Sequence, residues 1–299
     1  MEMLRIEGLY KSFGDKKVLK GLDLAVPEHS IFGFVGKNGA GKTTAMKTVL
    51  GLLRADRGKI FVNSDEVVYG CSTTNRHIGY LPDVPEFYSF MTAPEYLKFC
   101  IGISRTECEN VRGRIDELLE TVGLLGEKHR IKGFSRGMKQ RLGIAQALIC
   151  SPKLLICDEP TSALDPAGRK EILDILLSIK DQTTVLFSTH VLSDVERICT
   201  DVAFLEDGVI CLQGKLEDIK KRYRSEEYLI ELFAPEDALS ILDAIGCARR
   251  ITPTRIILKE GTHSLFDLYD LLAKKHIKVS KMERIEPSLE SLFLEVTKK

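Results

Sequence analysis

The stretch that decides the fold runs Gly36-Lys37-Asn38-Gly39-Ala40-Gly41-Lys42-Thr43 and reads G-x-x-x-x-G-K-[ST], the pattern of a phosphate-binding loop. An apolar run of strand character precedes it at residues 30–35, and residues 44–50 follow with helical spacing. A glycine-rich loop in this position turns its amide groups inward around a phosphate, and the helix adds its positive end. Lys42 offers a cation to the phosphates and Thr43 a hydroxyl to Mg²⁺. The motif alone also allows a glycine-rich turn without a ligand.

Composition narrows the class of protein. The chain has 299 residues, 44% of them hydrophobic, which is enough for one large domain or two modest ones. Its 43 basic residues balance 43 acidic ones, so no global field favours nucleic acid or an anionic membrane. The start lacks the pattern of a secretion signal, and no stretch approaches the about 18–20 apolar residues of a membrane span. We expect a soluble cytoplasmic protein that meets a membrane only through a partner.

The cysteines indicate a reducing compartment. Eight are present, none in a C-x-x-C pair, and most lie in apolar runs. This pattern predicts reduced, buried thiols. A zinc site is the alternative, although the usual ligand spacing is missing.

The N-terminal part predicts two strands, residues 4–10 and 16–26, joined by a turn that carries Phe13. Phe13 is either a core residue at the end of a hairpin or an aromatic plate on which a nucleobase stacks. Spacing alone leaves both interpretations open.

A helical block follows the strand at residues 78–82. Thr92, with Pro94 and Glu95 behind it, is typical of a helix start, and helical spacing continues to about residue 125. We expect a helical subdomain over about residues 88–150. Ser135 and Gly137 then begin another helix, where the serine is either an ordinary cap or part of a second phosphate contact.

Two apolar strands end in polar side chains. Residues 153–157 lead into Asp158 and Glu159, and residues 183–189 lead into His190. Strands buried on both faces place such residues at the carboxyl edge of a sheet, where α/β folds bind ligands. Asp158 there can hold Mg²⁺ and Glu159 can take a proton from water, unless both are only solvated acids at a strand end. His190 is either a structural histidine or a polar contact to phosphate.

The charged stretch at residues 220–227 suggests a boundary between domains 1–220 and 221–299. Before it, the Asp207-Gly208 turn predicts a hairpin. After it we expect a strand at 228–233, a helix at 235–245, a strand or hairpin at 249–259, a helix at 264–276, a strand at 279–284 and a helix from 288. This order is that of a small α+β unit of the split-βαβ kind.

Taken together, residues 2–215 resemble the ATP-binding cassette of ABC transporters. Residues 36–43 are similar to the Walker A motif, 134–141 to the signature motif and 154–159 to the Walker B motif. Residues 162–165 look like the D-loop, His190 falls at the switch histidine, and Phe13 lies where the family has an adenine-stacking aromatic. The resemblance implies an α/β P-loop NTPase fold with a mixed sheet core, an antiparallel β subdomain, a helical subdomain and a small C-terminal α+β domain.

The resemblance also implies a mechanism in which two cassettes, identical or related, enclose ATP, with Ser135 and Gly137 of each acting on the other's nucleotide. Glu159, His190 and Lys42 would be catalytic, and Asp165 would communicate across the dimer. Mg²⁺ would be held by Thr43 and Asp158, with Asp83 as a further ligand. The residues that would contact ATP are Phe13, Gly36, Lys37, Asn38, Gly39, Ala40, Gly41, Lys42, Thr43, Thr44, Asp83, Ser135, Gly137, Asp158 and Asp165.

Two positions depart from the family pattern. Asp83 stands where the family usually has Gln, which shortens the side chain and adds negative charge. Arg136 replaces a glycine of the signature motif; we expect it to point to solvent rather than to hold phosphate.

The resemblance implies the energising subunit of an exporter whose permease docks near Phe87, Tyr88 and Phe90. The residues 286–294 resemble the tail of drug- and antibiotic-export ATPases. An importer cassette is an alternative, as is a non-transport translation factor or DNA-repair ATPase. The translation factor usually carries a second cassette in the same chain, and the DNA-repair ATPase a long coiled-coil insertion before the signature motif. Neither feature is seen in this sequence.

Overall fold

The computed structural model describes residues 1–104, 109–223, 227–245, 248–259, 265–285 and 289–297. They divide into a cassette unit, Met1–Leu216 together with Glu295–Lys299, and a C-terminal unit, Glu217–Leu294. The expected boundary after residue 220 stays a prediction, because the charged stretch that suggested it lies partly outside the described residues.

The cassette unit is built on a mixed sheet. Its described strands follow the order β10-β9-β3-β8-β7-β6, parallel except for β10, which returns antiparallel to β9 in the expected hairpin. All residues of β3, β7 and β8 are buried, as their largely apolar sequences predict. The strands are β3 (Ile31–Val35), β6 (Ile78–Leu81), β7 (Leu154–Asp158), β8 (Thr184–Thr189), β9 (Asp201–Glu206) and β10 (Val209–Lys215).

A second, antiparallel sheet of the cassette unit has the order β2-β1-β4-β5 in the described residues. One core joins the two sheets: Leu24 and Ile60 of this sheet and Phe34 of β3 belong to a buried cluster that also contains Met46 of α1 (Lys42–Val49). The helix after the phosphate loop is therefore fixed between them. The strands are β1 (Glu2–Phe13), β2 (Lys16–Pro27), β4 (Arg57–Val62) and β5 (Asp65–Glu66).

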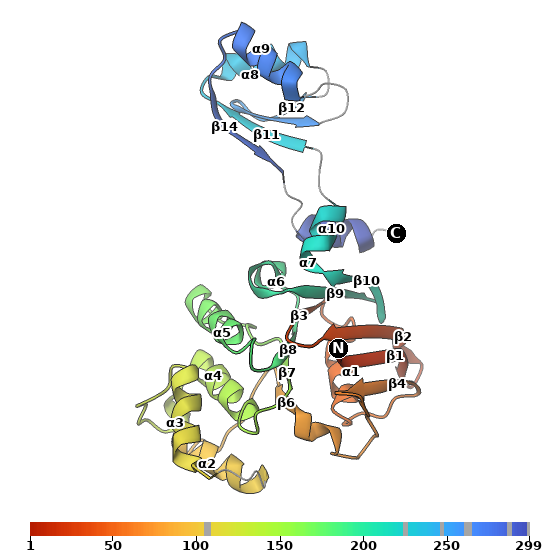
Figure 1. Cartoon of the computed structure of the whole chain (residues 1–299), viewed down its shortest axis with the longest axis vertical. Helices are drawn as coiled ribbons and strands as arrows, with labels where there is room; N and C mark the ends of the chain where they lie inside the picture. The colour runs from red at the N-terminus through yellow and green to blue at the C-terminus, as the bar shows by residue number, and fades with distance from the viewer. Residues whose placement is uncertain (105–108, 224–226, 246–247, 260–264, 286–288, 298–299) are drawn as a thin grey trace. The chain divides into compact units, whose positions relative to one another are not determined.

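The helices α2, α3 and α4 lie together on the side of the cassette away from β1, β2 and β4 (Figure 1). Tyr96 Oη of α2 donates to Gln146 Oε1 of α4 at 3.0 Å, which ties the group internally. The helical block predicted from residue 92 contains α2 and α3. The helices and short 3₁₀ turns are α2 (Ala93–Ser104), α3 (Val111–Thr121), α4 (Arg136–Ala147), α5 (Pro166–Ser178), α6 (Leu192–Ile198), η1 (Thr74–His77) and η2 (Ile131–Gly133).

The C-terminal unit confirms the split-βαβ prediction, with residues 249–259 forming the hairpin. Its described sheet has the antiparallel order β12-β13-β11-β14, and α8 and α9 pack on one face through Ile241 and Leu268 against Ile230 and Ile256. The elements are β11 (Glu227–Leu232), α8 (Pro235–Ala244), β12 (Ala248–Thr252), β13 (Arg255–Lys259), α9 (Leu265–Lys274) and β14 (Val279–Arg284), with α7 (Leu216–Arg222) before them and α10 (Leu289–Thr297) after. The start of the export-like tail, residues 286–288, lies outside the described residues.

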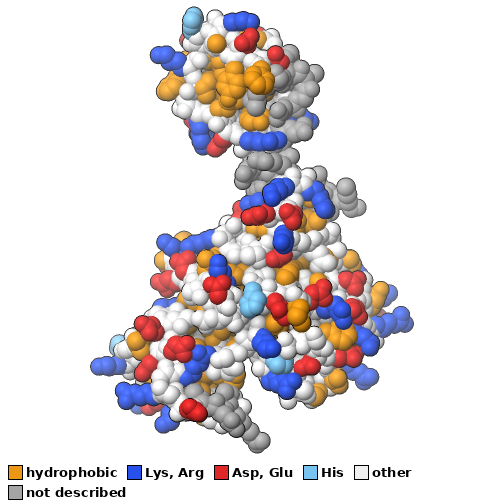
Figure 2. Space-filling model, in the orientation of Figure 1, with side chains coloured by type: hydrophobic (Ala, Val, Ile, Leu, Met, Phe, Trp, Pro, Cys, Tyr) orange, Lys and Arg blue, Asp and Glu red, His pale blue; other side chains and the backbone are white. Residues whose placement is uncertain are grey.

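Charged side chains of both signs are interspersed over the face of the cassette that Figure 2 shows. The cysteines are less uniformly buried than predicted. Cys100 and Cys157 are buried, whereas Cys71 and Cys211 are exposed and so are not core thiols; Cys108 and Cys247 lie outside the described residues. Among the described residues, no group of three or more His, Cys, Asp or Glu is placed to hold a metal ion.

Candidate functional site

The phosphate loop joins β3 to α1 at the carboxyl edge of the mixed sheet. Gly41 has φ of 112°, a left-handed conformation that favours glycine, and a Cβ at Gly36 would lie 2.6 Å from the carbonyl oxygen of Leu205. Among the described residues, no side chain caps the N-terminus of α1. The amide groups of the first helical turn are therefore available to an anion.

Lys42 is held inside this loop. Its Nζ donates to the carbonyl oxygen of Gly36 at 2.6 Å and of Lys37 at 3.3 Å, and lies 3.1 Å from Oε1 of Glu159. The side chain is 5% exposed. A cation so far from solvent needs these oxygens, so a phosphate that takes Lys42 must replace some of them.

Glu159 connects the loop lysine to the predicted histidine. Its Oε2 lies 2.9 Å from His190 Nδ1, while Oε1 faces Lys42. The backbone of Glu159 has φ of 48°, which is uncommon for a residue with a side chain. One carboxylate thus bridges two cationic or proton-donating groups, one at the start of α1 and one just after β8.

Ser188 is a site residue that the sequence analysis missed. Its Oγ donates to Oδ1 of Asp158 at 2.6 Å and accepts from the backbone N–H of Glu159 at 2.9 Å. The side chains of Ser188 and Asp158 are 0% and 3% exposed. The parallel register of β7 and β8 pairs these two residues directly, so the polar end of β8 was the available signal.

The negative charge of Asp158 affects the ionisation of a tyrosine on the neighbouring strand β6. Burial, together with the negative charge of Asp158, raises the pKa of Tyr80 on β6 to about 12. Asp83, two residues after β6, adds to the same effect. The ends of β6 and β7 thus gather acidic groups at one sheet edge.

These groups surround one cavity of about 570 Å³, a volume that suits a nucleotide. Of the residues predicted to contact ATP, the structure brings nine to its wall: Phe13, Asn38, Gly39, Gly41, Lys42, Thr43, Thr44, Asp83 and Asp158, joined by the predicted catalytic residues Glu159 and His190. Gly36, Lys37 and Ala40 are not part of the lining. Lys16, Val18 and Ser162 line the cavity but were not predicted.

Phe13 is not a core residue. Its side chain is 49% exposed at the cavity wall, and Lys11 Nζ lies 5.2 Å from the ring centroid. Lys11 is itself paired with Asp56 at 3.2 Å. The core interpretation is therefore wrong, because the turn between β1 and β2 holds the ring away from the packed sheet.

Ser135, Gly137 and Asp165 lie outside the lining of this cavity. Ser135 caps α4 by accepting from Met138 N at 3.2 Å, and Asp165 caps α5 by accepting from Gly168 N at 3.1 Å. A Cβ at Gly137 would lie 4.0 Å from Leu164, so the two helix starts are neighbours. They form a second set of polar groups beside the site.

A buried network links the loops that follow Glu159 and His190. Asp194 of α6 accepts from Thr161 Oγ1 at 2.7 Å and lies 4.0 Å from Arg169 Nε of α5. Burial raises the pKa of Asp194, and the contacts with Thr161 and Arg169 partly oppose this. Sequence reasoning missed these residues because none lies in a recognised motif.

A second cavity of about 480 Å³ adjoins the first, and Asp83 belongs to both walls. It lies between the segment after β6 and α4, and its lining includes Phe87, Lys139 and Gln140. Arg136 does not simply point to solvent: one of its guanidinium nitrogens is 3.8 Å from Oδ1 of Asp83.

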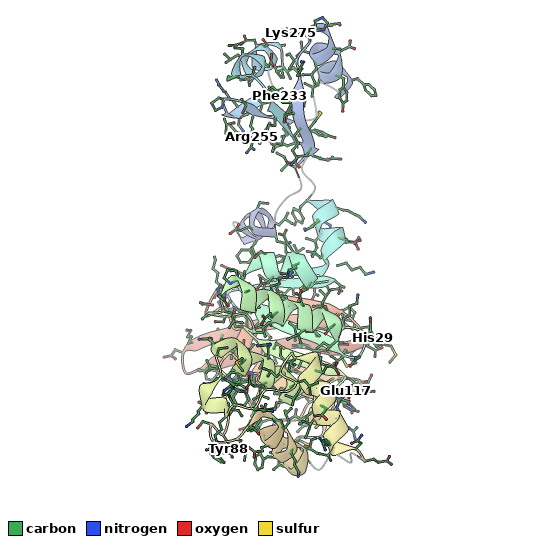
Figure 3. The ribbon with its side chains drawn as sticks, turned by 90° about the vertical axis from the view of Figure 1, so that its left-hand side faces the viewer. His29, Tyr88, Glu117, Phe233, Arg255 and Lys275 are labelled. Atoms are coloured by element: carbon green, nitrogen blue, oxygen red, sulfur yellow. The ribbon has the colours of Figure 1, made fainter. Side chains whose placement is uncertain are left out.

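Aromatic rings gather next to the second cavity. Tyr88 and Phe90 are 50% and 60% exposed, and Tyr88 meets Phe99 of α2 edge-on at 5.4 Å. Phe87 is only partly exposed, because its ring packs on Tyr96 at 5.1 Å. Figure 3 shows Tyr88 at the end of the cassette near the helical group.

A phosphate loop, a buried lysine, paired strand-end carboxylates and a histidine around one cavity define a P-loop ATPase of the cassette class. Comparison with known proteins agrees: residues 19–162 match the family model described as ABC transporter, and residues 214–297 match that described as ATP-binding protein DrrA1-3-like, C-terminal domain. The chain belongs to the ATP-binding proteins of ABC transporters.

Individual relatives cover most of the chain. The uncharacterized ABC transporter ATP-binding protein YxlF of Bacillus subtilis (strain 168) is 38% identical over 309 residues, spanning 98% of this chain and 99% of the relative. The bacitracin transport ATP-binding protein BcrA of Bacillus licheniformis is 38% identical over 228 residues, or 74% and 72% of the two chains. A solved ATP binding subunit of an ABC transporter is 30% identical, with a TM-score of 0.66 over 74% of this chain and 93% of that one. In the part of the chain that the structure describes, no helix is long and apolar enough to cross a membrane.

Proposed function

We propose that this ATPase energises a separate membrane permease that exports an antibiotic-like, drug-like, peptide or lipid-like substrate. The observation that carries the proposal is that a nucleotide-sized cavity and a second, aromatic-rimmed cavity share one wall at Asp83. A change in the first can therefore reach a partner seated at the second. The similarity to BcrA and to the DrrA1-3-like domain supports transport of antibiotic-like molecules.

Lys42 and the loop amides hold the phosphates in this proposal. Lys42 leaves Glu159 for the nucleotide, which frees the Glu159 carboxylate to take a proton from the attacking water. His190, now 2.9 Å from Glu159, is placed to orient that carboxylate and to meet the terminal phosphate. Catalysis then rests on positioning and on charge stabilisation within a partly enclosed site.

The donor set fits Mg²⁺, a hard cation that prefers oxygen ligands. Thr43 offers a hydroxyl, and Asp158 offers Oδ2 because Ser188 engages Oδ1. Asp83 lines the same wall, but its Oδ1 lies 3.8 Å from the guanidinium group of Arg136, so Thr43 and Asp158 are the proposed ligands. The ion would supply charge neutralisation on the phosphates.

A dimer of two cassettes completes the proposed site. Ser135, Gly137 and Asp165 are outside the cavity of their own chain, and their helix starts are neighbours at one surface. The positive ends of α4 and α5 suit contact with a nucleotide held by a second copy or a related cassette.

The permease docks, in this proposal, at the aromatic rim formed by Phe87, Tyr88 and Phe90. Exposed rings beside a groove are typical of protein interfaces, whereas isolated exposed rings are not informative. The protein would then sit at the cytoplasmic face of the membrane through its partner.

Isolation of the chain from membranes of its source cells under mild detergent tests the proposal. We expect an integral membrane protein to accompany the wild type. Replacement of Tyr88 and Phe90 by Ala should release the chain from that partner. Replacement of Phe266, an equally apolar side chain that is 81% exposed on α9, provides the matched control and should not release it. Recovery with ribosomes or DNA would instead favour a non-transport ATPase. ATP-driven accumulation of substrate inside right-side-out vesicles, whose cytoplasmic face is on the inside, would favour an importer.

A further inference from the structure

Helix α4 contacts Asp83 at two points spaced one turn apart. Gln140, which is 1% exposed, donates from Nε2 to the backbone oxygen of Asp83 at 2.8 Å. Arg136, four residues earlier and so on the same face of the helix, lies 3.8 Å from the carboxylate through its guanidinium group. The main chain and the side chain of Asp83 are thus both engaged by one helix.

The helix that makes these contacts is firmly seated. A Cβ at Gly143 would lie 2.5 Å from Leu81, and a Cβ at Gly79 would lie 2.3 Å from the backbone oxygen of Ala147. α4 therefore packs directly on β6, the strand that leads to Asp83. The positions of Arg136 and Asp83 relative to each other follow from this packing.

Asp83 is an unfavourable neighbour for an anion. It lines the cavity with Asp158 and Glu159, opposite the cations Lys16 and Lys42, and its charge already contributes to the raised pKa of Tyr80. A carboxylate next to phosphates lowers nucleotide affinity unless its charge is balanced. Its Oδ1 is buried and, among the described residues, has no hydrogen-bond donor, so Arg136 is the cation that faces it.

We propose that Arg136 is a positioning residue for the nucleotide site, which acts through Asp83 by balancing its charge and holding the carboxylate toward α4 and away from the phosphates. Arg136 lines only the second cavity, so it influences the nucleotide without contacting it in its own cassette. The inference rests on the proposed function of the cavity as the ATP site.

A double-mutant cycle with the full chain tests this role. Arg136→Gln should weaken ATP binding about two- to fivefold at low ionic strength, the range of a half-exposed ion pair. The same substitution in an Asp83→Asn background should change the affinity little, because no charge is left to balance. Any direct effect of Asp83→Asn cancels in this comparison. Equal losses in both backgrounds would overturn the proposal.

Three further measurements separate charge balance from a general structural role. The loss should be larger for ATP than for ADP and absent for adenosine, and Arg136→Lys should restore most of it. Lys139→Gln, the matched control on the same helix and the same cavity, should leave ATP affinity unchanged. An equal loss for adenosine or for Lys139→Gln would refute the role of Arg136.

The two proposals fail in different ways. If Lys42→Ala retains full ATP affinity, the assignment of the cavity as the ATP site fails. If Lys42→Ala abolishes binding but Arg136→Gln has no effect, only the role of Arg136 fails.

Discussion

Replacement of Glu159 by Gln should slow hydrolysis and, at the same time, tighten nucleotide binding. The reason is the 3.1 Å contact between Glu159 Oε1 and Lys42 Nζ, a pair in which the lysine is 5% and the glutamate 14% exposed. At an effective dielectric constant of about 20, two unit charges at that separation attract by about 5 kcal/mol, but hydration offsets most of this. The ion pair contributes at most what a charge-assisted hydrogen bond does, about 1.5–3 kcal/mol net, and a neutral amide in its place about 1 kcal/mol.

Glu159→Gln therefore lowers the cost of moving Lys42 from residue 159 to a phosphate by about 0.5–2 kcal/mol, which corresponds to roughly two- to thirtyfold tighter ATP binding. Loss of a negative charge near the phosphates acts in the same direction. Hydrolysis should fall by about 10²–10⁴, the range of a general base. Calorimetric titration with ATP and a phosphate-release assay measure the two effects.

The matched control is Glu206→Gln. Glu206 pairs with Lys37 of the same loop at 2.9 Å, but that lysine is 63% exposed and outside the cavity. We expect its ATP affinity to stay within about twofold of wild type, because solvent screens an exposed pair. Weaker ATP binding by Glu159→Gln, or undiminished hydrolysis, would refute the reasoning.

Lys42→Ala should abolish ATP binding, since it removes the buried cation of the loop; retained affinity in the same titration would contradict the whole site. Ser188→Ala should lower the free energy of unfolding by about 2–4 kcal/mol in denaturant titrations, because it leaves both a buried carboxylate oxygen and the N–H of Glu159 unpaired; a loss near zero would show that these bonds contribute nothing. Asp194→Asn should flatten the fall in stability that occurs as the pH rises above the ordinary pKa of an aspartate. The raised pKa of Asp194 means that its favourable contribution is present below the unfolded pKa and is lost as pH rises through the folded value, so an unaltered slope in the variant would argue against it.

The fold was predictable where one short pattern carries the information. A pattern of about ten residues was enough to predict each of three features. These are the phosphate loop, the apolar strands that end at Asp158 and His190, and the Asp207-Gly208 hairpin. In the C-terminal unit, alternating strand and helix patterns were enough to predict the order of elements, although they left open whether residues 249–259 form one strand or a hairpin.

Contacts that depend on register or on helix packing could not be predicted. Ser188 meets Asp158 only because β7 and β8 align in parallel with that pairing. Arg136 meets Asp83 only because α4 packs on β6, and the local sequence of Arg136 at a helix start suggested solvent instead. Spacing alone did not place Phe13 at the cavity wall, because periodicity does not say which side of a turn faces a ligand; only the family resemblance did.

The strand order of the mixed sheet has a consequence for synthesis. β3, with five buried residues, lies between β8 and β9, and Ile31 pairs with Val185. A ribosome adds about 5–20 residues per second, so roughly 8–30 s pass before the about 150 further residues that include those partners exist. During that time the apolar strand lacks both of its neighbours and can pair with strands of other chains. The phosphate loop, translated early, is among the last parts of the cassette to take shape.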